Sequence, residues 1–215
     1  MSVLAIVCAV IVTLVGHCVL VAALARRAGI EVSRVSIFYG PRILETTIGG
    51  VTVELGLLPL GSYVAFPQVD PEAADGKTVL DAAPRSTRLM LAVTPYAVTL
   101  ALGLLVLGPV DGLRAFGRAF IQLPAGGFLF FKYGRELVGS VVEALATLSP
   151  LVIGALTLVK LSAFNLLPLP TLSGARAVEA LIGRSLPVGA FAAGALLVPL
   201  CALGWIAAIV SYWLA

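Results

Sequence analysis

The sequence is poor in charged residues, in histidine and in cysteine. Only 12% of its 215 residues are charged and 60% are hydrophobic, whereas a soluble domain carries roughly 25% charged residues. This composition predicts an integral membrane protein with little length left for an aqueous domain. The net charge of +3 is small and spread along the chain, so we expect no nucleic acid partner. Cys8, Cys18 and Cys201 lie in separate apolar stretches and do not form a disulfide framework.

Four apolar stretches are expected to cross the membrane as helices, each needing about 20 residues. They cover residues 2–25, 89–108, 149–168 and 186–213 of a single membrane domain, 1–215. The first stretch has no basic residues before it, and its basic pair, Arg26 and Arg27, follows it. We therefore expect a retained transmembrane helix and not a signal peptide.

Residues 35–66 are apolar but unlike a helix. Short β-branched, alternating runs flank Gly49-Gly50, a dipeptide typical of a hairpin turn. Strands with unpaired edges cannot face lipid, so we expect a small sheet at the membrane interface, packed on the helices. The predicted fold class is a membrane all-α bundle with a small β-hairpin or sheet and about four transmembrane helices.

Residues 111–143 interleave aromatic and basic side chains. This mixture is typical of an amphipathic segment at the headgroup boundary, although the same face could contact a partner protein. Residues 124–127, Pro-Ala-Gly-Gly, are expected to break the segment into two pieces.

The one histidine, His17, lies within the first apolar stretch, where it is unfavourable unless it is buried against other helices or has a function. The residues after it, 25–41, resemble the stretch that follows the zinc motif of the site-2 protease family of intramembrane metalloproteases. On that alignment the family's His-Glu-x-x-His falls on residues 17–21. His17 keeps the first histidine, Cys18 takes the place of the glutamate, and Val21 takes the place of the second histidine.

Further segments extend the resemblance in the same order along the chain. Residues 59–64, Pro-Leu-Gly-Ser-Tyr-Val, are similar to the family segment that follows its membrane-associated hairpin, and Tyr63 falls on the family's tyrosine. Asn165 and Pro168 match the family's Asn-x-x-Pro-x-x-x-x-Asp-Gly, but Ser173 stands at the aspartate that is the third zinc ligand in active members.

The resemblance implies a zinc-protease fold whose metal positions have changed. Zinc hydrolases hold zinc through three protein ligands, and the motif's glutamate acts as general base. Valine cannot bind metal, serine is a poor ligand, and Cys18 points about 100° around the helix from His17. We therefore expect no zinc and no enzyme activity.

Three functions are compatible with these residues. The leading hypothesis is an inactive metalloprotease homologue that acts as a membrane binding or scaffold subunit of a larger complex. It would bind lipids and a membrane-protein partner through the groove and the hairpin edge, with strand addition as the physical mode. The alternatives are an active protease with an unusual site, formed by His17, Cys18 and a partner's ligands, and a small transport or lipid-handling module. The candidate groove residues are Gly49, Gly50, Tyr63, Lys160, Asn165 and Pro168.

Lys160 is an intramembrane lysine, which is a functional candidate by default. It could instead snorkel to the nearer interface or pair with a carboxylate of this chain or of a neighbour. In the four-span arrangement nine basic residues lie on one side and four on the other. The side with nine basic residues should be cytoplasmic, which places the N-terminus outside. We expect the membrane to be a bacterial inner membrane. The nine are Arg26, Arg27, Arg34, Arg42, Lys77, Arg85, Arg88, Arg176 and Arg184.

Overall fold

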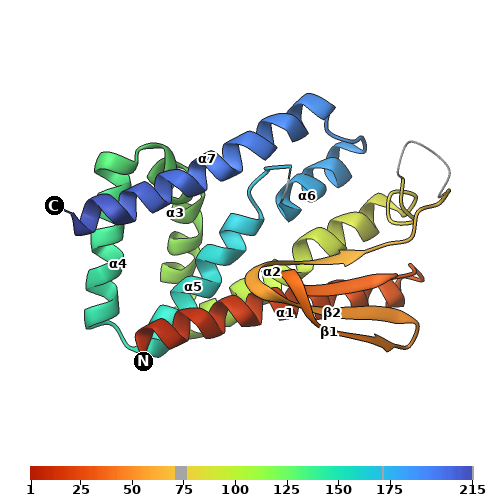
Figure 1. Cartoon of the computed structure of the whole chain (residues 1–215), viewed down its shortest axis with the longest axis horizontal. Helices are drawn as coiled ribbons and strands as arrows, with labels where there is room; N and C mark the ends of the chain where they lie inside the picture. Colours follow the sequence, from red (N-terminus) through yellow and green to blue (C-terminus); the bar gives the residue numbers. More distant parts are fainter. Residues whose placement is uncertain (71–76, 171, 215) are drawn as a thin grey trace.

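The computed structural model describes residues 1–70, 77–170 and 172–214, and most of these residues are helical (Figure 1). A small sheet lies beside α1, α3 and α4 stand at the other end of the bundle, and α7 runs from that end toward α6 (Figure 1). The elements are α1 (Ser2–Arg27), β1 (Arg34–Ile48), β2 (Val51–Ala65), α2 (Arg85–Leu107), α3 (Pro109–Phe128), the π-helix η1 (Phe130–Gly134), α4 (Arg135–Thr147), α5 (Pro150–Asn165), α6 (Ser173–Ile182) and α7 (Val188–Trp213).

Three helices in the described part of the chain are long and apolar enough to cross a membrane. They are α1, α2 and the Ala192–Trp213 part of α7, and they support an integral membrane protein. The helix α5 is apolar but has only 16 residues, about 24 Å at 1.5 Å per residue, against a hydrocarbon core of about 30 Å. It ends at Asn165 because the turn that leads to Pro168 follows. The expected count of four spans therefore stays a prediction.

The predicted small sheet is confirmed. β1 and β2 pair in an antiparallel sheet, and Gly49 and Gly50 form the turn between them, both with positive φ (56° and 79°), as a tight hairpin turn requires. Both strands are long and bent, so residues 34–37 pair with residues 52–55 on one side and with residues 62–65 on the other. Residues 62–65 consequently lie at an edge of the sheet.

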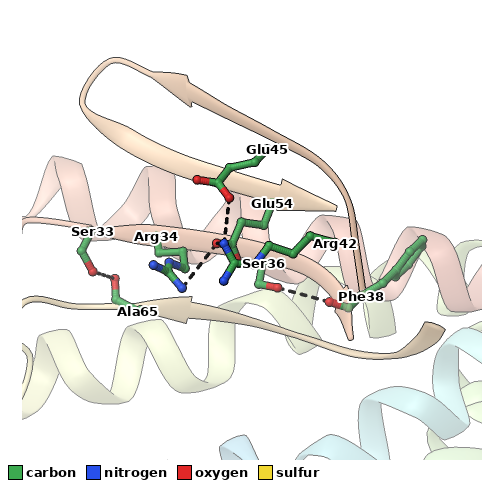
Figure 2. A network of polar contacts seen from close by, with 8 residues as sticks. All are labelled: Ser33, Arg34, Ser36, Phe38, Arg42, Glu45, Glu54 and Ala65. Atoms are coloured by element: carbon green, nitrogen blue, oxygen red, sulfur yellow. Dashed lines mark hydrogen bonds and ion pairs between the residues drawn. The ribbon is translucent and has the colours of Figure 1, made fainter. Parts of the chain in front are cut away.

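A buried carboxylate ties the bent part of the sheet together. The Glu54 side chain is 5% exposed and accepts ion pairs from Arg34 and Arg42 at 3.3 and 3.4 Å (Figure 2). Arg42 also donates to Glu45 at 2.8 Å. The hydrogen bond to Glu45, with the charge of Glu54 behind it, raises the pKa of the Arg42 guanidinium above its ordinary value. A charge can be buried here because two cations from β1 surround it.

The sheet is fastened to α1 by polar contacts along the helix. Ser62 donates to the Leu14 carbonyl at 3.0 Å, and Arg26 donates to the Gly49 carbonyl at 2.6 Å. Below these contacts Val21, Ala25, Val35 and other apolar side chains form a buried core between α1, the sheet and α2. The sheet and α1 are therefore joined by contacts at several positions along the helix.

A polar contact also joins α2 to α5. Thr99 and Ser162 are both buried, and their hydroxyl oxygens lie 2.7 Å apart. Val159 is also buried and packs against Gly103. A Cβ atom added to Gly103 would collide with the Val159 side chain. The close approach of these helices therefore depends on a small residue and on one interhelical hydrogen bond, both common in membrane bundles.

The break expected at residues 124–127 is wrong. α3 runs through Pro124 to Phe128, and the irregular segment is η1, which follows. Gly126 and Gly127 serve close packing instead: a Cβ on Gly126 would meet Trp205, and one on Gly127 would meet Cys201 of α7. Packing against a neighbouring helix thus outweighs the helix-breaking tendency of these residues.

Candidate functional site

His17 lies on the side of α1 that faces α2. Its ring stacks on Tyr96 with the ring centroids 5.2 Å apart and the planes 24° from parallel. Its Nδ1 atom is buried and makes no hydrogen bond within the described residues. An unpaired ring nitrogen in a buried position is costly, so this atom is a candidate to bind a ligand.

Tyr96 also links His17 to the start of α6. Ser173 donates from its hydroxyl to the Tyr96 hydroxyl over 3.4 Å, and α6 begins at Ser173. Asn165, at the end of α5, fixes its side chain by donating from Nδ2 to the Leu161 carbonyl at 2.9 Å. The fold therefore brings His17, Ser173 and Asn165 together around one tyrosine.

Two cavities meet at His17 and Ser173. One has a volume of about 530 Å³ and lies between α1, the sheet and the end of α5, with Asn165, Tyr96 and Ser62 among its walls. The other has a volume of about 390 Å³ and extends toward α6 and the start of α2. Both volumes fall within the range typical of ligand sites. The two cavities are neighbours that share these two residues in their walls, and we call the pair the His17 groove.

The far end of the His17 groove is charged. Arg176 pairs with Glu179 at 3.4 Å and with Asp81 at 3.9 Å, and all three line the 390 Å³ cavity. Glu179 is buried and its other oxygen accepts from the Leu186 amide at 2.9 Å. Arg88 lines the same cavity, and its Nε atom is buried without a hydrogen-bond partner within the described residues. This end of the groove thus offers charged and hydrogen-bonding groups, while the end near α5 is mainly apolar.

The sheet edge runs along both cavities. Pro59, Gly61 and Ser62 line the larger one, and Val64 and Ala65 line the smaller. The Ala65 carbonyl accepts from the Ser33 amide and so points into the sheet. Because backbone groups alternate along a strand, the amide and carbonyl of Val64 point the other way, toward the groove. The edge therefore presents backbone hydrogen-bonding groups next to His17.

The residues beside His17 in the sequence separate as helical geometry requires. Cys18 is fully buried on another face of α1, and its thiol lies 3.6 Å from the Ser36 carbonyl and 3.8 Å from the Tyr63 carbonyl, as a donor to the sheet. Val21 lies one turn after His17 and lines the 390 Å³ cavity with it. Cys18 therefore supports the sheet, and His17 is accompanied on the groove face of α1 by apolar residues and by Thr13, whose hydroxyl donates to the Ala9 carbonyl of its own helix.

The side chains of the groove do not fit a zinc ion held by three protein ligands. No group of three or more His, Cys, Asp or Glu side chains that could hold a metal occurs in the part of the chain that the structure describes. The thiol of Cys18 is directed to the sheet, and Glu179 is engaged by Arg176 and the Leu186 amide. We derive no chemical step through a metal, and the expectation about zinc stays a prediction.

The other predicted groove residues lie elsewhere. Gly49 and Gly50 form the exposed hairpin turn, and Tyr63 stacks on Tyr39 with centroids 6.1 Å apart. Pro168 is exposed in the turn after α5. Lys160 lines a separate cavity nearer the start of α5. His17 and Lys160 therefore line different cavities among the described residues.

Sequence reasoning missed Tyr96, the residue that joins the two halves of the site. A signal was present, since a tyrosine follows Pro95 in the middle of an apolar span, where its hydroxyl needs a partner. It also missed Arg88 and Glu179, which lie far apart in the sequence and meet only through the packing of α2 on α6.

This arrangement defines an integral membrane protein with cavities between its helices and the edge of a small sheet. The family described as Peptidase family M50 matches residues 2–203. The chain therefore belongs to this family, which is the site-2 protease family, and the resemblance drawn from its motifs is confirmed. No curated protein matches the chain.

Family membership corrects one prediction. The family is one of metalloproteases, so the prediction that the chain is not an enzyme is wrong. The replacements at Cys18, Val21 and Ser173 are facts of the sequence, but on their own they do not show loss of activity.

Proposed function

We propose that this member of the site-2 protease family binds an extended segment of a membrane polypeptide in the His17 groove. The observation that carries the proposal is the exposed edge of β2, residues 62–65, which lies along the groove beside His17. An extended chain added to this edge satisfies its backbone groups by pairing with the strand, and side chains on alternate positions fill the groove.

The shape and polarity of the groove support a polypeptide ligand. The two cavities adjoin at His17 and Ser173, which line both, and together they offer space for a chain several residues long. Within a membrane an unwound segment needs partners for its backbone groups, and the outward amide and carbonyl of Val64 supply two. The Tyr96 and Ser173 hydroxyls and Nδ1 of His17 offer further polar groups near the middle of the groove.

We further propose that the bound polypeptide belongs to a membrane-protein partner, and that the N-terminus lies outside the cytoplasm of a bacterial inner membrane. The orientation is supported by contacts that gather basic residues at the sheet end, such as Arg26 at the hairpin and Arg176 at Asp81. A membrane-impermeant maleimide applied to intact cells should label Ser2→Cys and not Arg27→Cys.

The test of binding uses reconstituted vesicles and defined single-span peptides. A photo-crosslinking amino acid at Val64 should capture a peptide whose span contains helix-breaking Gly and Pro residues, and should capture a poly-leucine span much less. The same crosslinker at Thr47, in the hairpin arm away from residues 62–65, serves as control. Equal capture from both positions would contradict strand addition at the groove.

A backbone substitution sharpens this test. For this test the photo-crosslinking amino acid is placed at Phe66, which lines the same cavity as Val64. Val64→Pro removes the outward amide, and an edge strand tolerates proline, so peptide capture should fall while the fold persists. Val64→Ala shortens the side chain and keeps the amide, so it should capture the peptide nearly as well. A Val64→Pro protein that still captures the peptide would show that the edge amide is not used.

Hydrolysis of the bound polypeptide is the second candidate function, because the family is one of metalloproteases. His17 is the groove side chain with a free ring nitrogen among the described residues and is the residue we would place next to the peptide. Cleavage products in the crosslinking assay that disappear in His17→Ala but persist in Val21→Ala would support it. We propose that this chain alone does not hold zinc, which metal analysis of the purified protein would check.

A further inference from the structure

A second cavity, which we call the Lys160 cavity, is lined by residues 153–160 of α5, whereas the His17 groove is lined by residues 161–165 at the end of this helix. It has a volume of about 240 Å³ and is bounded by α1, α3, α4, α5 and α7. Its walls are mostly aliphatic, with Leu137, Val141 and Leu145 on α4 and Ile153 and Leu156 on α5. In Figure 1, α4 stands at the end of the bundle beyond α3. Val141 is 45% exposed, so the cavity opens at the surface along α4.

Lys160 supplies the charge of this cavity. Its Nζ atom donates to Gln122 Oε1 at 3.4 Å, and no carboxylate pairs with it among the described residues. The acidic residues of α4, Glu136 and Glu143, do not line the cavity. An intramembrane cation with only a neutral partner is unfavourable unless a ligand supplies the opposite charge. The cavity therefore has one anion-attracting point in an otherwise apolar space.

Water is a poor occupant of this space. A buried water needs two to four polar partners, and each takes about 30 Å³, so filling about 240 Å³ would require more polar groups than the walls provide. The polar residues present are Lys160, Gln122, Ser140 and Thr157. A whole helix is too large, since its diameter with side chains is about 10–12 Å. An acyl chain that ends in an acidic group matches both the aliphatic wall and the single cation.

We propose that the Lys160 cavity binds an acyl-chain lipid that carries an anionic group, with the carboxylate or phosphate at Lys160 Nζ and the chain along α4. Lys160 precedes the end of α5 by five residues, about 8 Å, a depth that local thinning of the bilayer accommodates. The site is separate from the His17 groove and does not depend on peptide binding there.

Trp205 provides the readout for the experiment. It lines the Lys160 cavity, and its Nε1 donates to the Leu123 carbonyl at 2.9 Å, which holds the ring in the wall. The chain has two tryptophans, and the other, Trp213, is 71% exposed at the end of α7. In a Trp213→Phe protein the fluorescence therefore reports on the cavity, and bromine atoms on a bound acyl chain should quench it.

The probes are dibromostearate and its uncharged methyl ester, added to the purified protein in neutral detergent. We expect half-maximal quenching at a concentration about tenfold lower for the acid, the factor expected of one charge-assisted hydrogen bond. Brominated phosphatidylglycerol and phosphatidylcholine then distinguish a phospholipid source from a free fatty acid.

Matched variants decide the outcome. In Lys160→Gln, acid and ester should reach half-maximal quenching at nearly the same concentration. In Lys160→Arg, the roughly tenfold preference for the acid should remain. Lys132→Gln removes an exposed lysine on η1 and should change nothing. Ala144→Leu fills the cavity without changing its charge and should weaken quenching by both probes, which keeps the proposal testable should Lys160→Gln not fold.

Three results would overturn the proposal. The first is equal quenching by acid and ester in the parent protein, and the second is a preference that survives Lys160→Gln. The third is a second protein that co-purifies in stoichiometric amount with the parent and is lost only from the Lys160→Gln variant. This result would show that Lys160 pairs with a carboxylate on a helix of that second protein.

Discussion

The two ends of the molecule are held together by different means. Around the His17 groove, side-chain hydroxyls join separate elements, as Thr99 does with Ser162 and Ser173 does with Tyr96. At the other end, α3 and α7 meet through glycines, and a Cβ on Gly204 would collide with the Gly127 carbonyl. One hydrogen bond, from Trp205 Nε1 to the Leu123 carbonyl, accompanies these glycine contacts. Stability at this end should therefore depend mainly on space for close backbone contact, and at the sheet end more on single hydroxyl groups.

Gly204→Val should have the largest effect on stability. The added side chain has no space against Gly127, and overpacking of this kind costs about 3 kcal/mol. Thermal unfolding in detergent, followed by circular dichroism, measures the loss. Gly189→Val is the control, because Gly189 lies at the start of the same helix and a Cβ there would have no neighbouring atom within 4 Å. A Gly204→Val protein as stable as the control would show that glycine contacts do not hold this end.

Ser162→Ala should have an intermediate effect. It removes the buried bond to Thr99 and leaves that hydroxyl with partners on its own helix only, so a loss of about 1 kcal/mol is expected. Ser211→Ala removes a hydroxyl that bonds only within α7 and should cost less. Equal unfolding temperatures for the two variants would mean that the α2–α5 contact depends on packing alone.

Tyr96→Phe should change function more than stability. The ring keeps its stack on His17, but the hydroxyl partner of Ser173 is lost. Peptide capture in the His17 groove should fall about two- to threefold, the factor for about 0.5 kcal/mol, while the unfolding temperature shifts little. Tyr212→Phe, at the opposite end of the molecule, should leave capture unchanged. An equal loss of peptide capture in Tyr96→Phe and Tyr212→Phe would show that the Tyr96 hydroxyl has no specific role in binding at the groove.

Local sequence patterns predicted much of the fold. The β-branched runs around Gly49-Gly50 indicated the hairpin, because the turn residues and the alternation both lie within a few positions of one another. The family motifs indicated that His17 and Ser173 meet. The patterns did not reveal the bend in β1 and β2, since the register of residues 34–37 with two parts of β2 depends on the buried Glu54 and its arginines.

Other features depend on contacts between distant segments and could not be read from local patterns. The segment 124–127 resembles a break, but α7 packs so closely on Gly126 and Gly127 that α3 continues. The length of α5 was overestimated because its apolar composition extends past Asn165. Lys160 was grouped with the groove residues because helical periodicity cannot say which neighbour each face of α5 meets.

The fastening of the sheet to α1 has a consequence for how a guest chain arrives. Contacts from Ser62 to Leu14, from Cys18 to Ser36 and from Arg26 to Gly49 close that flank over much of the helix. A guest polypeptide of the proposed kind would therefore not enter along this flank. The fold would limit its direction of approach before any side chain of the guest is recognised.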